Sequence, residues 1–280
     1  MSGLYDWLHD LPVAAGPPDL RMGTRSLDVT DWLAPDGLVE QELALRASLL
    51  AAHPEFVHID DGHDAALEEV RSLVEIHIGD RLRTDVANPI EQLALSVQED
   101  ILLMHRSSAA SDPLWRLVGG TLLFPNQWRL QDKLGLDMTA IHGPVDGYDP
   151  LLAKRVAQFF DRLSPARPAW RRNWFFHEDP ALFQPERLMH SPIDDPDDVP
   201  RLWIRSEYQT LRRMAFSEVI VFAVKTQLAP IGEVARRPEL AAHMVTFLES
   251  ASPRSLENKD ADGRHDAIID YLRRPLVPGT

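Results

Sequence analysis

Cysteine is absent from this chain of 280 residues. Disulfides, cysteine-ligated zinc and iron–sulfur clusters bound within the chain are therefore excluded. Long apolar runs are missing as well, because no stretch approaches the roughly 18 apolar residues that a membrane helix needs. Residues 1–10 contain neither the basic segment nor the apolar segment of a secretion signal. These absences predict a cytoplasmic protein that does not span a membrane.

Positive charge is scarce: 29 Lys and Arg residues stand against 43 Asp and Glu residues, which gives a net charge of −14. So acidic a chain is a poor candidate for binding nucleic acid or an anionic membrane surface. The common nucleotide-binding glycine motifs, the nucleophile-elbow motif and the helical zinc motif are also absent. The sequence therefore does not indicate a P-loop, dinucleotide-binding, serine hydrolase or zinc protease protein.

Apolar periodicity places helices at both ends of the chain and strands at its centre. The predicted helices cover 38–52, 64–82, 149–163, 230–236, 239–250 and 264–274, and the predicted strands cover 95–104, 115–124, 169–176, 201–211 and 219–227. This order predicts an α+β fold with a mainly antiparallel sheet. No linker is evident, so we expect one domain over residues 1–280, with 1–20 as an extended lead-in and 276–280 as a tail.

Several connecting segments carry local signals. Asp112-Pro113 predicts a turn, and Gly119-Gly120 inside a strand predicts a bulge or a close approach of backbones. We expect 125–148 to be irregular and 253–263 to be a flexible connection. His58 and His63 could suggest a metal site, but their surroundings favour a solvated turn between two helices.

Alternation along two of the predicted strands separates their side chains into two faces. In the strand 201–211, one face carries Leu202, Ile204, Tyr208 and Thr210, and the other carries Trp203, Arg205, Glu207, Gln209 and Leu211. In the strand 169–176, one face carries Arg171, Asn173 and Phe175, and the other carries Trp170, Arg172 and Trp174. Aromatic and charged residues on one face indicate either a lined cavity or a solvated face with exposed aromatics. The sequence pattern leaves both interpretations open.

Seven short motifs occur in a characteristic order. They are Val97-Gln98-Glu99-Asp100, Phe124-Pro125-x-x-Trp128, Lys133-x-Gly135, Ile141-His142-x-Pro144-Val145-x-Gly147-Tyr148, Arg167-Pro168-x-Trp170-Arg171-x-Asn173-Trp174, Leu182-Phe183-Gln184-Pro185 and Arg205-x-Glu207-x-Gln209-Thr210-Leu211-x-Arg213. This set resembles the haem-dependent oxidative N-demethylase alpha-subunit-like family, over roughly residues 20–275.

The resemblance implies a PAS-like curved antiparallel sheet, flanked by N- and C-terminal helices, that carries haem b. It implies a monooxygenase that removes an N-methyl group from a small secondary amine such as dimethylamine and releases formaldehyde. The electrons would come from NAD(P)H through a separate flavin and iron–sulfur reductase or ferredoxin partner. Without cysteine, the iron ligand cannot be a thiolate, so nearby polar groups would have to supply protons.

The resemblance also assigns site residues. Of the 11 histidines, only His142 lies inside a family motif, so it is the expected axial iron ligand. The alternative is a distal or structural His142, with His177 or His105 as the ligand. The other residues expected to bind the cofactor are Lys133, Trp128, Arg171, Asn173, Arg205 and Arg213. We expect at least two of these four basic residues to share a cavity with Trp128.

Glu207, Gln209 and Tyr148 are the expected catalytic side chains. A secondary amine is cationic at neutral pH, so Glu207 is the candidate to bind it, with the aromatic face of Trp128 or Trp174 as an alternative. Equally, Glu207 could form a structural ion pair with a neighbouring arginine, Arg205 or Arg213.

Three positions depart from the family pattern. Tyr208 stands where arginine is common, Asp146 where proline is common, and Asn126 where serine is common. Two other functions remain open at this point, because fold alone does not decide function. One is a haem-binding sensor or carrier module without turnover, and the other is a domain that has lost haem and serves only in interactions.

Overall fold

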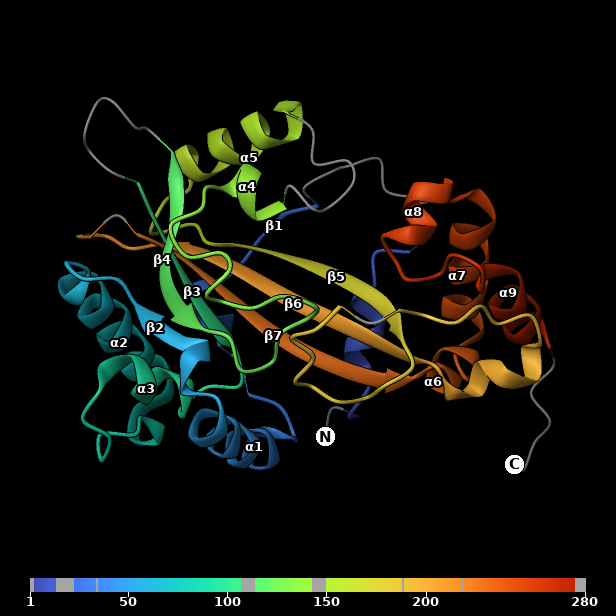
Figure 1. Ribbon diagram of the computed structural model, residues 1–280, viewed down its shortest axis with the longest axis horizontal. Coiled ribbons are helices and arrows are strands. Elements are labelled where there is room, and N and C mark those ends of the chain that lie inside the picture. Colours follow the sequence, from blue (N-terminus) through green and yellow to red (C-terminus); the bar gives the residue numbers. More distant parts are fainter. Residues whose placement is uncertain are drawn as a thin grey trace.

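The computed structural model describes residues 3–13, 23–33, 35–106, 114–142, 150–187, 189–217 and 219–274; the side chains of residues 142 and 150–153 lie outside that description. Across those ranges the strands form one seven-stranded antiparallel sheet with the order β1-β5-β6-β7-β3-β4-β2 (Figure 1). The strands are β1 (Arg25–Ser26), β2 (Val57–Ile59), β3 (Asp100–Arg106), β4 (Trp115–Thr121), β5 (Ala169–His177), β6 (Trp203–Arg213) and β7 (Ile220–Pro230).

Helices surround this sheet. They are α1 (Val39–Ala52), α2 (Asp64–Ile78), α3 (Pro89–Ala94), α4 (Met138–His142), α5 (Pro150–Arg162), α6 (Ile231–Ala235), α7 (Pro238–Ser250), α8 (Pro253–Glu257) and α9 (His265–Arg273). Figure 1 shows α2 and α3 at one end of the long strands and α6 to α9 at the other. The mixture of helices with an antiparallel sheet confirms the predicted α+β class.

The register of the sheet confirms the alternation predicted for each of two strands and shows which of their faces coincide. Asn173 of β5 is opposite Glu207 of β6, and Arg171 is opposite Gln209. Directly opposed residues in an antiparallel pair point to the same side. We call the side that carries Arg171, Asn173, Arg205, Glu207 and Gln209 the polar face. The other side, which we call the opposite face, carries Trp170, Arg172, Trp174 and Tyr208.

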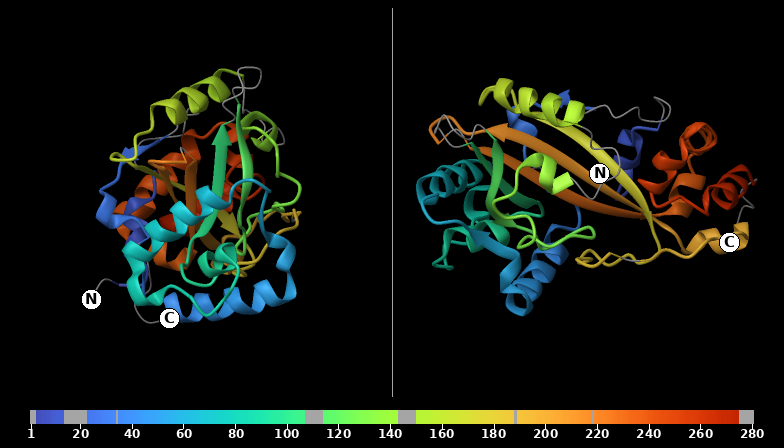
Figure 2. Two further views of the ribbon diagram at one scale, coloured as in Figure 1. Left: turned by 90° about the vertical axis from the view of Figure 1, so that its left-hand side faces the viewer. Right: turned by 45° about the horizontal axis from the view of Figure 1, so that its top comes forward.

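Separate apolar clusters cover the two faces. On the polar face, Phe160 of α5 packs in one cluster with Leu102 of β3 and Leu211 of β6. On the opposite face, α2 and α3 pack against Ile101 and Leu103 at one end of the sheet. Helices α6, α7 and α9 cover the other end of that face. The two views in Figure 2 show α4 and α5 lying together, away from these three C-terminal helices. The helices thus cover both ends of the opposite face, whereas on the polar face α5 packs near Leu211 and loop carbonyls of Phe124 and Ala181 reach Arg205.

The prediction for Gly119-Gly120 is confirmed as a close approach of backbones. A Cβ atom at Gly120 would lie 2.4 Å from the carbonyl oxygen of Ile101, and one at Gly119 would lie 2.6 Å from that of His58. The register of β3 also shifts between Leu103 and Met104, opposite this pair. A larger residue would separate β4 from both neighbouring strands.

Some predicted boundaries are wrong. The strand predicted over 95–104 begins only at Asp100, because the short helix α3 ends at Ala94 and the turn that follows it takes up residues 95–99. Residues 57–59, predicted as part of a turn between helices, pair with β4 as the edge strand β2. The segment 253–263, predicted to be flexible, contains α8, whose first turn is capped by Ser252. Helices and strands of three to six residues are too short to show an apolar periodicity in the sequence.

Two further segments also differ from the prediction. The irregular stretch 125–148 contains the short helix α4. The lead-in contains a 3₁₀ helix, Asp6–Asp10, whose Leu8 is fully buried in the core cluster beside α7 and α9. The predicted turn at Asp112-Pro113 and the tail 276–280 lie outside the described residues. Among the described helices, none is both long and apolar enough to cross a membrane.

Candidate functional site

Arg205 joins two loops at the centre of the polar face. Its side chain is fully buried and donates to the carbonyl oxygens of Phe124 and Pro125 at 2.9 Å each, and to those of Ala181 and Leu182 at 3.1 Å. Burial is the main cause that lowers the pKa of Arg205 to about 10. All of these acceptors are backbone oxygens, so Arg205 holds the loops in place.

Asp100, the last residue of the first motif, anchors the same loop from β3. Its carboxylate accepts from the backbone N–H groups of Leu123 at 2.8 Å and Phe124 at 2.9 Å, and it forms a buried ion pair with Arg46 at 3.0 Å. The two loops also bridge each other, because Gln127 N–H donates to the carbonyl of Gln184 at 2.6 Å. The backbone just after Pro125 is therefore fixed on several sides.

This arrangement places Asn126 against Glu207. The Nδ2 of Asn126 donates to Glu207 Oε1 at 3.3 Å, and the Nε2 of Gln209 donates to Glu207 Oε2 at 2.7 Å. Oδ1 of Asn126 is buried and accepts from no described residue, and the same holds for Oγ1 of Thr226, which is opposite Glu207 on β7. The partly buried carboxylate of Glu207 thus accepts from the side-chain amides of Asn126 and Gln209, and the unused oxygens of Asn126 and Thr226 are nearby.

Arg171 supplies a cation to the same face. Its Nε is buried and donates to no acceptor among the described residues. Burial lowers the pKa of the Arg171 guanidinium, while the carboxylate of Glu207 acts in the opposite direction. A buried donor without an acceptor is unfavourable, so the Nε of Arg171 fits an acceptor that a ligand supplies.

Lys259 also reaches the polar face, and the sequence analysis missed it. Its buried Nζ donates to Asn173 Oδ1 at 2.7 Å and to the carbonyl of Trp174 at 3.0 Å. Burial, followed by the charge of Arg171, lowers the pKa of Lys259 to about 7. Lys259 lies just after α8, and its own carbonyl accepts from Phe176 N–H at 3.0 Å. No local motif marks it, because its role depends on this long-range docking.

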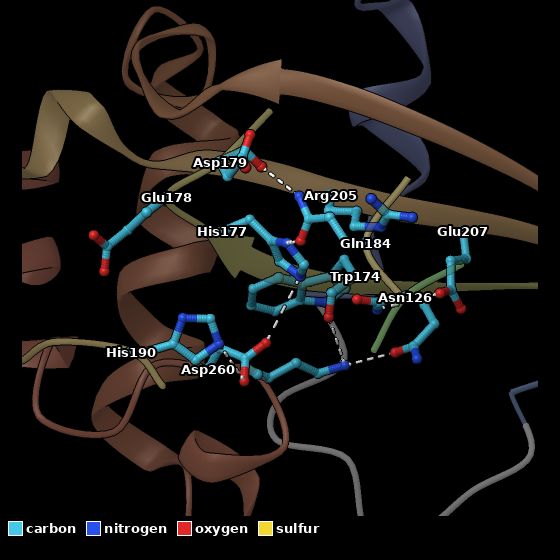
Figure 3. Close-up of polar contacts among 12 residues, drawn as sticks. Asn126, Trp174, His177, Glu178, Asp179, Gln184, His190, Arg205, Glu207 and Asp260 are labelled. Carbon is cyan, nitrogen blue, oxygen red and sulfur yellow. Dashed lines mark hydrogen bonds and ion pairs between the residues drawn. The ribbon is translucent and has the colours of Figure 1, made fainter. Parts of the chain in front are cut away.

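Two histidines lie on either side of Asp260, and one of them, His177, is next to Arg205 (Figure 3). His177 is buried, and its Nδ1 is 2.9 Å from Oε1 of Gln184. Because Nε2 of Gln184 donates elsewhere, its oxygen accepts, and Nδ1 of His177 carries the proton. Burial and the charge of Arg205 lower the pKa of His177 to about 4. Asp260 lies between His177 and His190, with Oδ2 3.8 Å from Nε2 of His177 and Oδ1 3.2 Å from Nε2 of His190.

The remaining predicted residues lie elsewhere. Lys133 Nζ donates to the carbonyl of Ile141 at 2.8 Å, directly before His142. Arg213 is at the far end of β6, about 26 Å from Arg205 along the strand, where its guanidinium lies 5.7 Å from the Trp115 ring centroid. Trp128 is partly buried against the apolar cluster under α5.

The other histidine candidates have partners of their own or lie outside the description. His105 Nδ1 is 3.2 Å from Nε2 of His63, and His58 is 3.1 Å from Asp60. Tyr148 and the side chain of His142 lie outside the described residues. In the part of the chain that the structure describes, no three His, Asp or Glu residues are grouped as metal ligands.

The described elements form an α+β fold whose polar face gathers Arg171, Glu207 and Lys259. Residues 75–269 match the family model described as haem-dependent oxidative N-demethylase, alpha subunit-like. This segment is more than half of the chain, and the protein belongs to that family. It extends from α2 to α9, so it includes Arg171, Glu207 and Lys259.

Proposed function

We propose that the protein is a haem-dependent monooxygenase that removes an N-methyl group from a small secondary amine and releases formaldehyde. Its family supports the class of reaction. The observation that carries the proposal to this site is the buried, unused Nε of Arg171, whose guanidinium interacts with the carboxylate of Glu207. Such a pair suits an anionic cofactor and a cationic substrate placed side by side.

The residues of the polar face fit haem b. Arg171 would hold a propionate, because its buried Nε has no acceptor among the described residues. Phe222, Val224 and Leu228 of β7 lie on the same face and are partly exposed, so they offer an apolar wall to a porphyrin. His142 would hold the haem iron, and the hydrogen bond from Lys133 to Ile141 would fix the backbone next to it.

Bound haem supplies an iron centre for activating O2, with electrons from NAD(P)H through a separate reductase. With dimethylamine as the substrate, the overall change balances: the amine, O2, two electrons and two protons give methylamine, formaldehyde and water. Glu207 binds the substrate ammonium and takes its proton. Gln209 and Asn126 hold one oxygen each of that carboxylate, so its position is fixed before the substrate arrives.

The test is amine-dependent turnover. The haem-loaded protein, a flavin and iron–sulfur reductase, NAD(P)H and dimethylamine are combined, and formaldehyde and methylamine are measured. We expect both products in equal amounts, and Glu207→Gln to lower kcat/KM at least tenfold, as loss of a charge-assisted hydrogen bond does. Haem-loaded protein that is reduced but forms no formaldehyde from small methylamines would contradict the proposal and favour a sensor or carrier.

A further inference from the structure

Asn126 carries an unused acceptor beside Glu207 on the polar face. Its Nδ2 is oriented by the carboxylate of Glu207, because an amide oxygen in that place would face another oxygen. Oδ1 therefore points away from Glu207, and it is buried without a donor among the described residues. Buried polar atoms almost always have a hydrogen-bond partner, so this one fits a donor that arrives with the ligand.

The backbone around Asn126 cannot readily adjust to satisfy this oxygen. Asn126 forms a parallel bridge with Gln184, and the next residue, Gln127, has a left-handed backbone with a φ of 62°. The preceding carbonyl, that of Pro125, accepts from Arg205 at 2.9 Å and from Gln184 N–H at 3.2 Å. The amide is thus fixed in place before any ligand binds.

We infer that Asn126 is a specificity-determining residue whose Oδ1 accepts one N–H of a substrate ammonium while Glu207 accepts the other. This inference deepens the proposed function, because it assumes that the polar face binds the amine. A carboxylate has about four lone-pair sites. Glu207 can therefore accept a substrate N–H while it keeps the bonds from Asn126 and Gln209.

The inference defines a substrate class by the number of its N–H groups. A dialkylammonium ion carries two N–H donors and satisfies both acceptors. A trialkylammonium ion carries one donor and leaves a buried acceptor unused, and a tetraalkylammonium ion carries none. A site with a buried polar group rejects ligands that leave this group unpaired.

Calorimetric binding of dimethyl-, trimethyl- and tetramethylammonium to the haem-loaded protein tests this order. In the wild type, we expect the affinity to fall about tenfold or more for each N–H removed. A tenfold change in affinity corresponds to about 1.4 kcal/mol of binding free energy. Asn126→Leu, which is similar in size but has no acceptor, should lower the dimethyl-over-trimethyl preference about tenfold. Asn126→Ser tests whether a shorter acceptor retains part of it, and Gln131→Leu, an exposed amide on the same loop, should retain all of it.

The outcomes separate the two proposals. Trimethylammonium bound as tightly as dimethylammonium by the wild type would overturn the role of Asn126, whatever the variants do. An unchanged preference in folded Asn126→Leu would also overturn it, and in both cases amine turnover would leave the proposed function in place. If none of the three ions binds at all, both proposals fail.

Discussion

The guanidinium of Arg205 donates to the carbonyl oxygen of Pro125 across 2.9 Å, directly before Asn126. Through this bond a central strand of the sheet sets the position of a loop residue 80 positions earlier in the chain. Arg205 belongs to the motif that also contains Glu207. The same strand therefore carries the carboxylate and fixes the amide that contacts it.

Replacing Arg205 should destabilise the protein and loosen the site together. Arg205→Met removes four hydrogen bonds to backbone oxygens, and the oxygens of Phe124 and Leu182 then have no other donor among the described residues. We therefore expect a loss of about 3 kcal/mol or more in the free energy of unfolding. Amine affinity should fall as well, because Asn126 is no longer fixed. Urea unfolding measures the first effect and calorimetry the second. Arg213→Met, at the far end of β6, is the control, and equal losses in the two variants would argue against this role of Arg205.

Gly120→Ala should be severely destabilising. The added Cβ would lie 2.4 Å from the carbonyl oxygen of Ile101 and 2.9 Å from the Cα of Leu102, so β3 and β4 would have to move apart. We expect a loss of about 2–4 kcal/mol in unfolding free energy. Gly37→Ala is the matched control, since no atom lies within 4 Å of its added Cβ. A Gly120→Ala protein as stable as this control would refute the close approach.

Glu42→Gln should stabilise the protein at neutral and alkaline pH. Burial is the main cause that raises the pKa of Glu42 from 4.5 to about 7, although Gln98 donates to its Oε2 at 2.7 Å. Because the folded pKa lies above the unfolded one, stability is present below about pH 4.5 and is lost as pH rises through about 7. Denaturant unfolding from about pH 4.5 to 8 should show that slope in the wild type and little of it in the variant. Parallel curves would contradict the raised pKa.

Amine affinity should depend on the charge of Lys259. The pKa of this buried lysine is lowered to about 7 and is affected by Glu207. As pH rises through about 7, Lys259 loses its proton and stops repelling a cationic substrate, so dimethylammonium should bind more tightly. Binding titrations from about pH 6 to 8.5 measure this.

In Lys259→Met the affinity should be nearly independent of pH over that range. The exposed Lys154 provides the control, since Lys154→Met should keep the wild-type profile. A wild-type affinity that does not change, or one that falls as pH rises, would show that Lys259 does not act on the bound amine. The folding stability of the wild type should rise between about pH 7 and 10.5, because the folded pKa of this base lies below its unfolded value.

The sequence predicts those parts of the site that depend on local alternation. Arg171 and Asn173 lie on one face because they are two residues apart on a strand, and the same holds for Glu207 and Gln209. The contact between Asn126 and Glu207 joins residues 81 positions apart. No periodicity predicts it, because it depends on how the loop after β4 is fixed by Arg205 and Asp100.

The parts that could not be predicted are short or depend on long-range docking. The strand β2 has three residues and α8 has five, which is too few for a periodic pattern. Lys259 is an ordinary lysine in the sequence. It becomes part of the site only because the segment after α8 packs along the edge of β5. The assignment of His142, Tyr148 and the PAS-like curvature remains a prediction from the family resemblance.

Haem binding is the central claim, and an absorption titration of the purified protein with haemin tests it most directly. We expect a Soret band that saturates at one haem per chain and that moves in His142→Ala, with added imidazole restoring the wild-type position. A wild-type protein that shows no spectral change at saturating haemin would contradict haem binding. An unchanged Soret band in His142→Ala would remove His142 from the iron.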